Sequence, residues 1–336
     1  MKKLGLINIY IFACILLLIV AIIAAISSGR FSDEPTADTL KNEGTNSYCN
    51  FLLLGKDSTA GLCDVMILTS IDLQSGDTCV MQIPRDTYFK YTDGSYKKIN
   101  GAPASLGNAA FADELARALG INIDYYLSLD LDTVKKMVDA VSGIKINVPS
   151  DMDYDDPAQD LSIHLKAGEQ ILNGEAAVQF LRYRSGYVTG DLGRVDAQKL
   201  FLNAFAKRLG EIKNLSTLVS LFKLTCSGDT NINEQALVSI GSKCAKNKGG
   251  TLHYLTAPGK AVQTEQSGAW YYVLSERSMT EVLMAHFGLS SSEKDFDKDN
   301  KFVDNQNKSF YDIYNGRCEY RLYTADDLEN NEININ

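Results

Sequence analysis

Hydrophobic and polar positions divide the chain into an apolar opening segment, a polar linker and a long body in which two periodicities alternate. Short apolar runs that end at turn-forming residues predict strands, and apolar positions three or four residues apart predict amphipathic helices. The predicted strands cover residues 51–54, 65–73, 78–83, 125–129, 144–148, 251–256 and 270–273. The predicted helices cover residues 109–119, the segment from Asp132 to Gly143, 175–181, 194–209, 215–224, 234–245 and 279–287. Strands interleaved with helices predict an α/β domain whose sheet is covered on both faces, with Asp132 and Asn173 as N-caps of two helices.

The opening segment, Leu4–Ile26, has 23 residues without a charge. A helix of that length reaches about 34 Å, which is enough for the roughly 30 Å hydrocarbon core of a bilayer. Lys2 and Lys3 precede the segment and acidic residues follow it, so the positive-inside rule places the N-terminus in the cytoplasm and the body outside. The small residues that end the run also permit a cleaved signal peptide, although the apolar core of such a peptide is usually shorter. Both alternatives make the body extracytoplasmic, and the length favours an anchor in the cell membrane.

Shifts in composition set the predicted domain boundaries. Residues 1–3 form a cytoplasmic tail, residues 4–27 the transmembrane anchor, and residues 28–48 a linker rich in Ser, Thr, Asp, Glu and Asn. Residues 49–288 form the α/β body. Residues 289–336 are polar, and the pattern assigns them no firm structure.

The charge of the body excludes one broad class of function. The 336-residue chain has a formal net charge of −9, and setting aside Lys2 and Lys3 leaves 31 basic and 42 acidic side chains. A body with this acidic balance has no basic field to attract a nucleic acid. Any anion that it binds must therefore be held by a local cluster of cations.

Cysteine and histidine give weaker signals. The cysteines outside the apolar segment are Cys49, Cys63, Cys79, Cys226, Cys244 and Cys318. Their even number permits disulfides with fifteen connectivities, whereas the apolar surroundings of the first three are equally compatible with buried thiols. A zinc site is poorly supported, because no CxxC pair occurs and none of the three histidines has ligand spacing.

Two carboxylates and one arginine follow the ends of the first three strands. Asp57 follows the first strand, Asp64 stands where the second begins, and Arg85 follows the third. Strands that are neighbours in sequence usually pair, so these side chains are expected at one end of the sheet. Such a group suits a hard cation and an oxyanion, since Mg²⁺ prefers one or two carboxylates with phosphate oxygens. The alternative is that the two aspartates are turn residues and the arginine is their solvated partner.

A second charged cluster lies further along the chain, in a glycine-containing loop and the helix after it. Its members are Arg182, Arg184, Asp191, Arg194, Gln198 and Lys199. Arg194 and Gln198 are four residues apart and share a helix face, near a helix start where backbone N–H groups favour anions. Guanidinium groups bind phosphate in a bidentate manner, so the cluster predicts a phosphate site. The alternative is a surface helix with ordinary ion pairs.

Seven short motifs occur in the order found in the LytR–CpsA–Psr family. They are Leu53–Asp57, Cys63–Met66, Ile83–Tyr88, Lys98–Ala102, Leu172–Ala176, Leu181–Arg184 and Gly190–Val195, the last followed by Gln198. Between about Asn50 and Phe287 the chain therefore resembles that family, whose members also carry a single N-terminal helix.

The resemblance implies a fold and an activity. The family fold is a three-layer α/β/α sandwich with a mixed central sheet and a lipid-binding tunnel, preceded by one transmembrane helix. Its members attach an anionic glycopolymer, such as a teichoic acid or a capsular polysaccharide, to a muramic-acid hydroxyl of peptidoglycan through a phosphodiester. The donor is a glycan linked to polyprenyl pyrophosphate, so the resemblance implies a Mg-dependent phosphotransferase.

The same resemblance implies a role for each charged residue. Asp57 and Asp64 would hold Mg²⁺ on the pyrophosphate, and Gln198 would hydrogen-bond beside it. Asp191 would orient an arginine or, alternatively, accept a proton from the acceptor. The implied catalytic residues are Arg85, Arg182, Arg184, Asp191 and Arg194, and the four arginines would neutralise the pyrophosphate oxygens.

The sequence departs from the family at two positions where arginine is frequent. Leu62 stands before the second aspartate motif, and Ala197 precedes Gln198. The loss of two cations is compatible with weaker pyrophosphate binding, a different donor or a degenerate paralogue, and Lys56 or Lys199 would be the compensating cation. Two rival functions follow: a polyprenyl-diphosphate pyrophosphatase that uses water, and a membrane-anchored lipid- or glycan-binding regulator without turnover.

Overall fold

The computed structural model describes residues 47–56, 61–157, 161–188, 190–212, 214–233, 236, 250–264, 267–290 and 296–329. The predicted cytoplasmic tail and membrane anchor lie outside these residues, and so does nearly all of the predicted linker. Within the described residues, no helix combines the length and the apolar character that crossing a bilayer requires.

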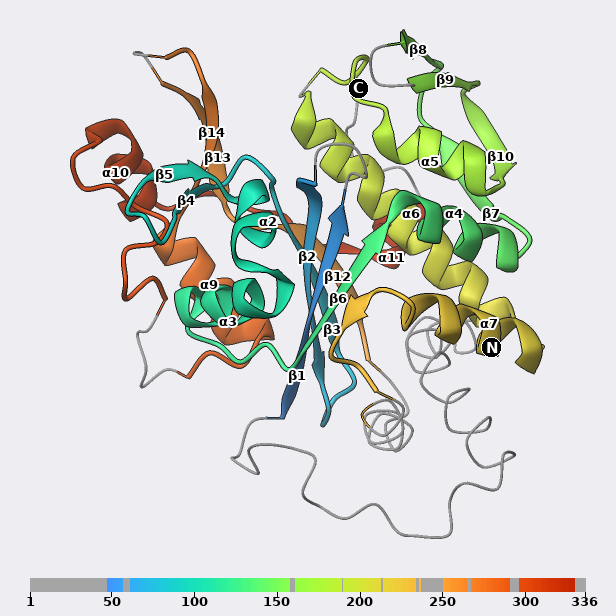
Figure 1. Cartoon of the computed structure of the whole chain (residues 1–336), viewed down its shortest axis with the longest axis horizontal. Coiled ribbons are helices and arrows are strands. Elements are labelled where there is room, and N and C mark those ends of the chain that lie inside the picture. The colour runs from blue at the N-terminus through green and yellow to red at the C-terminus, as the bar shows by residue number, and fades with distance from the viewer. Residues whose placement is uncertain are drawn as a thin grey trace, which may run out of the picture.

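A seven-stranded sheet runs through the middle of the domain (Figure 1). In spatial order its strands are β11 (Asp229–Thr230), β6 (Tyr125–Asp130), β1 (Tyr48–Lys56), β2 (Cys63–Asp72), β3 (Thr78–Ile83), β12 (Leu252–Thr256) and β15 (Tyr323–Thr324). The strands β1, β2 and β3 pair antiparallel as chain neighbours. β6 joins β1 in parallel, and β12 joins β3 in parallel. The sheet is therefore mixed, and the predicted α/β class is confirmed.

Helices cover both faces of this sheet (Figure 1). On one face lie the short η2 (Ile99–Gly101), α2 (Ala102–Leu106), α3 (Asn108–Leu119), α9 (Glu276–His286) and α10 (Lys308–Asn315). On the other lie α4 (Leu131–Ala140), α5 (Gly174–Arg182), α6 (Asp191–Glu211), α7 (Leu215–Thr225) and α11 (Ala325–Glu329).

Within the described residues, four two-stranded sheets lie around the central one. They pair β4 (Tyr88–Lys90) with β5 (Tyr96–Lys98), β7 (Ile144–Val148) with β10 (Gly168–Leu172), β8 (Met152–Asp156) with β9 (Leu161–Leu165), and β13 (Gly259–Gln263) with β14 (Trp270–Leu274). The strand predicted at 144–148 is thus β7, which lies outside the central sheet. Figure 1 shows the β13–β14 hairpin rising beside the end of the sheet where β1 finishes and β2 begins.

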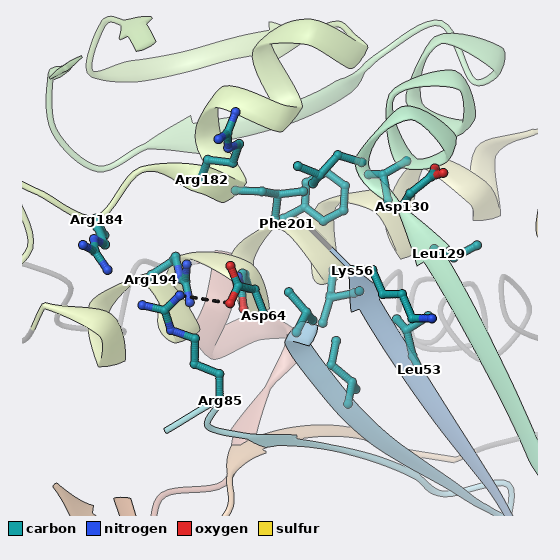
Figure 2. A pocket seen from close by; sticks show the side chains of 18 of the residues that line it. Leu53, Lys56, Asp64, Arg85, Leu129, Asp130, Arg182, Arg184, Arg194 and Phe201 are labelled. Carbon is teal, nitrogen blue, oxygen red and sulfur yellow. Dashed lines mark hydrogen bonds and ion pairs between the residues drawn. The ribbon is translucent and has the colours of Figure 1, made fainter. Parts of the chain in front are cut away.

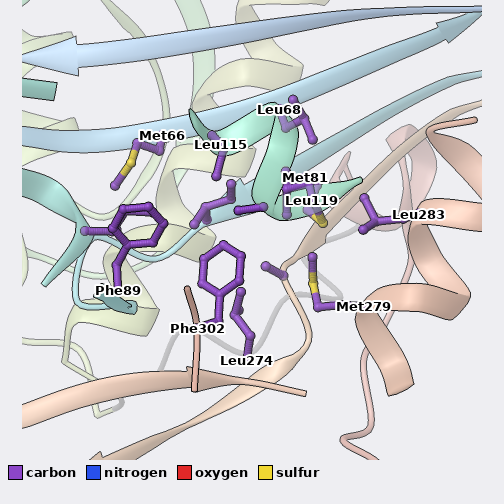
Figure 3. Close-up of a cluster of buried hydrophobic side chains, with 14 of the residues drawn as sticks. Met66, Leu68, Met81, Phe89, Leu115, Leu119, Leu274, Met279, Leu283 and Phe302 are labelled. Carbon is purple, nitrogen blue, oxygen red and sulfur yellow. The ribbon is translucent and has the colours of Figure 1, made fainter. Parts of the chain in front are cut away.

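Side-chain alternation along the strands divides the interior into two cores. Leu54 of β1 and Leu68 of β2 point into the first core, with α3 and α9. Figure 3 shows this core, in which Phe89 and Phe302 pack beside the strand residues. The second core lies between the other face and α4, α5 and α6, and includes Leu129, Phe180 and Phe201.

The helix ends test the predicted caps. Asn173 is the N-cap of α5, as predicted, because its Oδ1 accepts a hydrogen bond from the N–H of Ala176 at 2.9 Å. The prediction for α4 is wrong: its N-cap is Asp130, whose Oδ1 accepts from the N–H of Thr133 at 2.7 Å. Asp132 instead lies in the first turn, where a negative charge is also favourable. The predicted helix at 234–245 lies almost entirely outside the described residues.

The C-terminal segment packs against the body, although its sequence gave no firm prediction. Phe302 and Phe310 are at most 1% exposed and join the first core. β15 extends the central sheet beyond β12. The folded unit therefore continues past residue 288, at least as far as α11.

Candidate active site

A cavity of about 410 Å³ lies between the central sheet and the helices α4, α5 and α6. Its lining includes the polar side chains Asp64, Arg85, Arg182, Arg184, Arg194 and Gln198. Leu53, Ile67, Leu129, Val134, Leu161 and Phe201 are among its apolar lining residues. In Figure 2 the charged groups around Asp64 and Arg85 lie beside the apolar wall that Leu53 and Leu129 help to form. The cavity is therefore built for a ligand with an anionic part and an apolar part.

Asp64 and Arg85 meet because of the register between β2 and β3. Met66 pairs with Ile83 in this antiparallel ladder, so Asp64 and Arg85 stand level with each other just beyond its end. Pro84 has no N–H to donate and ends β3. Nη1 of Arg85 lies 3.0 Å from Oδ1 of Asp64 (Figure 2). The structure thus brings together two of the three residues that the strand order placed at one end of the sheet.

Asp191, the first residue of α6, connects the two charged clusters. Its Oδ1 lies 2.9 Å from Nη2 of Arg194, one turn along the helix, and 3.2 Å from Nη2 of Arg85. Gly190 precedes the helix with φ of 59°, a conformation that favours glycine. One carboxylate oxygen therefore holds two guanidinium groups side by side. This geometry is compatible with the first of the two roles expected of Asp191, which is to orient an arginine.

Burial affects the two arginines differently. The side chain of Arg194 is only 8% exposed, and burial lowers its pKa, against the attraction of Asp191 and with the repulsion of Arg85. Burial also opposes charge on Arg85, but the attraction of Asp191 and Asp64 outweighs it, so the pKa of Arg85 is raised. Both remain guanidinium ions. The buried Nε of Arg194 has no hydrogen-bond partner among the described residues, so this donor is left for a ligand.

Arg182 and Arg184 supply unpaired positive charge to the same cavity. Arg182 is the last residue of α5, and Arg184 follows its C-cap, Tyr183. Figure 2 shows both set apart from Asp64, and neither forms an ion pair within the described part of the chain. Because Arg85 and Arg194 are balanced by two aspartates, the positive excess here comes from Arg182 and Arg184.

Packing of aromatic rings fixes the loop that carries Arg184. The rings of Tyr183 and Tyr187 meet edge to face, 5.3 Å apart, and both residues are buried. A Cβ on Gly186 would clash with the hydroxyl group of Tyr183, so a larger residue there would displace the Tyr183 ring. The loop is therefore held by a specific packing arrangement rather than by ion pairs.

Gln198 lies one turn after Arg194 on α6 and is buried at the cavity wall. Its Oε1 accepts a hydrogen bond from Nε2 of Gln82 on β3. That contact leaves the amide nitrogen of Gln198 available to a ligand oxygen. No sequence motif singles out Gln82, whose one signal is the amide side chain that it places in the strand 78–83.

The predicted metal ligands are only partly described. Asp57 lies outside the described residues, and among those described no group of three or more His, Cys, Asp or Glu side chains forms a metal cluster. Asp64 lines the cavity with its side chain 28% exposed and one oxygen on Arg85. Mg²⁺ takes one or two carboxylates and completes its shell with phosphate oxygens and water, so Asp64 fits as one ligand of a shared site.

Two lysines that were possible replacements for the missing arginines lie in different places. Lys56, at the end of β1, lines the cavity together with Asp130, and sequence analysis had no reason to include the latter. Lys199 is buried away from the lining, where its Nζ donates to Asp196 at 2.6 Å and to the Thr256 hydroxyl at 2.7 Å. Of the two, only Lys56 adds a cation to the cavity.

The two departures from the family pattern have ordinary surroundings. Ala197 is fully buried in the second core, and Leu62 is 37% exposed just before β2. The cysteines are also unremarkable: Cys63, Cys79 and Cys318 are buried free thiols. Burial raises the pKa of the Cys63 and Cys79 thiols to about 12, so they stay protonated.

The part of the chain that forms the cavity matches a known protein family. The model of the LytR_cpsA_psr family matches residues 20–287. The chain belongs to this family. The match extends over the strands, the loop and the helix that carry the cavity arginines.

Two transferases of Bacillus subtilis are similar to this chain in sequence, and one of them is also similar in structure. The polyisoprenyl-teichoic acid–peptidoglycan teichoic acid transferase TagV of Bacillus subtilis is 34% identical over 177 residues, which cover 51% of this chain and 45% of that protein. The TagU transferase of B. subtilis is 26% identical over 229 residues, 68% of this chain and 72% of the relative. The crystal structure of B. subtilis TagV superposes with a TM-score of 0.59 at 27% identity, covering 72% of this chain and 96% of that one. The sequence match to TagV thus spans less than half of that relative, whereas the structural match spans nearly all of the solved chain.

Proposed function

We propose that the protein is a phosphotransferase that attaches an anionic glycopolymer from a polyprenyl-pyrophosphate carrier to a hydroxyl group of peptidoglycan. The observation that carries the proposal is a cavity in which an arginine cluster adjoins an apolar wall. Two of its relatives are named as transferases of teichoic acid to peptidoglycan. Residues 4–27 would anchor the protein in the cell membrane, with the body on the outside.

The apolar wall supports a lipid-linked donor. Leu53 and Ile67 from the sheet, Val134 from α4 and Phe201 from α6 present hydrocarbon to the cavity. Each buried CH₂ group contributes about 0.8 kcal/mol, so a few isoprene units would hold the carrier firmly. The cavity would then be the inner part of the lipid-binding tunnel that the family resemblance implies.

The arginines support transfer at a diphosphate. The acceptor oxygen forms a bond to the phosphorus that bears the glycan, while the bond from that phosphorus to the bridging oxygen breaks. Polyprenyl phosphate leaves with the electron pair, and the acceptor's proton passes to solvent. Such a reaction depends on positioning and charge neutralisation, which Arg85, Arg182, Arg184 and Arg194 would provide.

Asp64, with Asp57, would hold the Mg²⁺ ion that the family resemblance implies. Bound there, the metal would supply further positive charge to the diphosphate oxygens. Asp191 keeps Arg85 and Arg194 in place, and the Gln198 amide nitrogen would donate to a phosphate oxygen.

The test uses the purified full-length protein with Mg²⁺, a short polyprenyl-pyrophosphate glycan and uncross-linked peptidoglycan. We expect glycan to become covalently bound to peptidoglycan and polyprenyl phosphate to be released in equal amount. Release of phosphate products without transfer would contradict the proposal and show that the protein is a pyrophosphatase. Binding of the donor without turnover would replace it by a regulatory lipid- or glycan-binding protein.

A pair of arginine variants links the activity to the site. Arg184→Ala removes a cation that forms no ion pair within the described residues, so we expect transfer to fall by about 10²–10³-fold while the fold is retained. Arg277→Ala is the matched control, because Arg277 is 66% exposed on α9 and, among the described residues, forms its ion pair with Glu281. Equal activity in the two variants would show that the cavity is not the reaction site.

A further inference from the structure

An exposed tryptophan stands on the β13–β14 hairpin. Trp270 is the only tryptophan in the chain, and it is 53% exposed at the start of β14. It pairs with Gln263 across the hairpin. The hairpin rises beside the end of the sheet that carries the charged cluster (Figure 1). An exposed indole is an amphipathic platform of the kind enriched in binding surfaces.

The backbone connects this hairpin to the arginine site. The N–H of Tyr272 donates to the carbonyl oxygen of Asp86 at 2.8 Å, and Thr87 forms a parallel bridge with Tyr272. The segment around Thr87 and strand β14 run in the same direction. Trp270 precedes Tyr272 by two residues, just as Arg85 precedes Thr87, so both lie in the same direction from the bridge. The strand that carries Trp270 is thus hydrogen-bonded to the turn that carries Arg85.

The base of the hairpin is firmly packed. The Tyr272 hydroxyl donates to the carbonyl oxygen of Ala257 at 2.9 Å in the interior. A Cβ on Gly259 would lie 2.7 Å from the Tyr272 ring, so only glycine allows the two strands this approach. The Tyr271 ring meets Tyr88 edge to face at 5.2 Å. The exposure of Trp270 is therefore a property of a fixed strand.

The direction of the reaction identifies what this surface would bind. In phosphoryl transfer the attacking and leaving oxygens lie roughly in line, on opposite sides of the phosphorus. The leaving group carries the lipid, and the apolar wall around Leu53 and Leu129 is on one side of the charged cluster (Figure 2). Arg85 belongs to the charged cluster, and the carbonyl oxygen of the next residue, Asp86, accepts a hydrogen bond from the hairpin. The acceptor would then approach from the side away from the lipid. Figure 1 shows the hairpin on the side of the sheet opposite α4 and α5, the helices that border the cavity.

We propose that the Trp270 face of the β13–β14 hairpin is the acceptor subsite and binds an amino-sugar glycan chain. This inference rests on the proposed transferase function. The apolar C–H face of a sugar ring stacks on the indole, while hydroxyl and amide groups of the chain stay solvated. The nearby ion pair of Asp86 with Lys98, at 2.9 Å, offers polar groups to the same chain.

A single tryptophan makes the test direct. The fluorescence of the full-length protein is titrated with soluble, uncross-linked glycan strands of alternating N-acetylglucosamine and N-acetylmuramic acid. We expect a saturable shift in emission, because Trp270 is the only indole that can report it. An emission spectrum that does not respond to the glycan in a protein that performs transfer would overturn the inference.

Steady-state kinetics separates acceptor binding from a structural role. Trp270→Ala should raise the KM for glycan by about tenfold, equivalent to about 1.4 kcal/mol, with the donor KM and the kcat nearly unchanged. Trp270→Phe should keep most of the affinity, since it retains an aromatic face. Tyr311→Ala is the control, as this residue on α10 is 43% exposed. A fall in kcat with an unchanged acceptor KM in Trp270→Ala would contradict the inference.

The same experiments distinguish the two proposals. If glycan shifts the emission but no polymer is transferred, glycan binding at the Trp270 face stands and the transferase function fails. If polymer is transferred and Trp270→Ala behaves as Tyr311→Ala does, the function stands and the subsite fails.

Discussion

The two faces of the central sheet are built by the same strands and differ in how their side chains are covered. Leu68 of β2 points into the first core, where Phe89, Phe302 and helices α3 and α9 fill the space (Figure 3). Its neighbour Ile67 points to the other face and lines the cavity of about 410 Å³. Side-chain alternation thus separates a closely packed layer from a hollow one within a single strand.

This difference assigns separate tasks to the two faces. Close packing maximises contact between apolar atoms and stabilises the fold. The hollow face forgoes part of that contact, and its empty space borders Arg194 and the other charged groups. We infer that the first face mainly provides stability and that the second provides the binding site. The following predictions test that division.

The largest effect is expected from truncating the packed face. Leu68→Ala should lower the free energy of unfolding by about 3–5 kcal/mol, because a fully buried leucine leaves a new cavity. Ile67→Ala should cost only about 2 kcal/mol, since the removed atoms enlarge a space that already exists. Denaturant unfolding of both variants measures the difference. Equal losses would mean that the two faces are packed alike.

Removing charge at the open end of the hollow face should have the converse effect. Arg85→Ala should reduce transfer by about 10²–10³-fold, or about 3–4 kcal/mol in transition-state stabilisation. The folded state should change by less than about 1 kcal/mol, because Asp191 keeps its contact with Arg194 and the Asp64 carboxylate, 28% exposed, can be solvated once Arg85 is removed. Single-turnover rates and thermal melts are measured on the same sample. Wild-type turnover in this variant would contradict the site, and a large loss of stability would contradict the division of tasks.

The strands of the central sheet and the N-cap of α5 were accessible from the sequence because they follow local rules. The predicted strand 78–83 is β3, and the adjacent turn residues lead Asp64 and Arg85 to the same end of the sheet. Asn173 was recognised as a cap from its position alone. In each case the signal lies within a few residues of the element that it determines.

The features that the sequence did not predict depend on tertiary packing. Nothing local indicates that Asp191 reaches Arg85 as well as Arg194, since the contact requires α6 to pack across the sheet. Gln82 has no motif and acquires its role only through Gln198. α10 spans eight residues, Lys308–Asn315, too few for a clear helical period in a polar segment. The cavity is a space between elements that are distant in the sequence, so local residue patterns do not predict it.

Filling the hollow face should weaken lipid binding with little effect on the fold. Val134 of α4 borders the cavity and is only partly buried. A Val134→Phe side chain can extend into the free space, so we expect a change in stability of at most about 1 kcal/mol. The KM for the polyprenyl donor should rise about tenfold, about 1.4 kcal/mol, while the KM for peptidoglycan stays the same. An unchanged donor KM would show that the lipid lies elsewhere.

The smallest effect concerns an acidic group buried in the packed face. Asp297 is 4% exposed beside Phe302, and burial raises its pKa to about 6, although hydrogen bonds from Tyr314 and from the N–H groups of Phe302 and Lys301 act in the opposite direction. In the unfolded chain an aspartate has a pKa of about 3.9. The folded state therefore binds the proton more tightly, and the stability that this group contributes is present below pH 4 and is lost as the pH rises through 6.

Between pH 5 and pH 7 this loss should amount to about 1 kcal/mol. Asp297→Asn keeps an oxygen that accepts from the two N–H groups, and it cannot titrate. The difference in unfolding free energy between wild type and variant should therefore shift by about 1 kcal/mol in favour of the variant on going from pH 5 to pH 7. Groups common to both proteins, such as Glu276, cancel in that difference. A difference that stays constant with pH would show that Asp297 is ionised throughout, and that the packed face holds a charge which its apolar surroundings do not penalise.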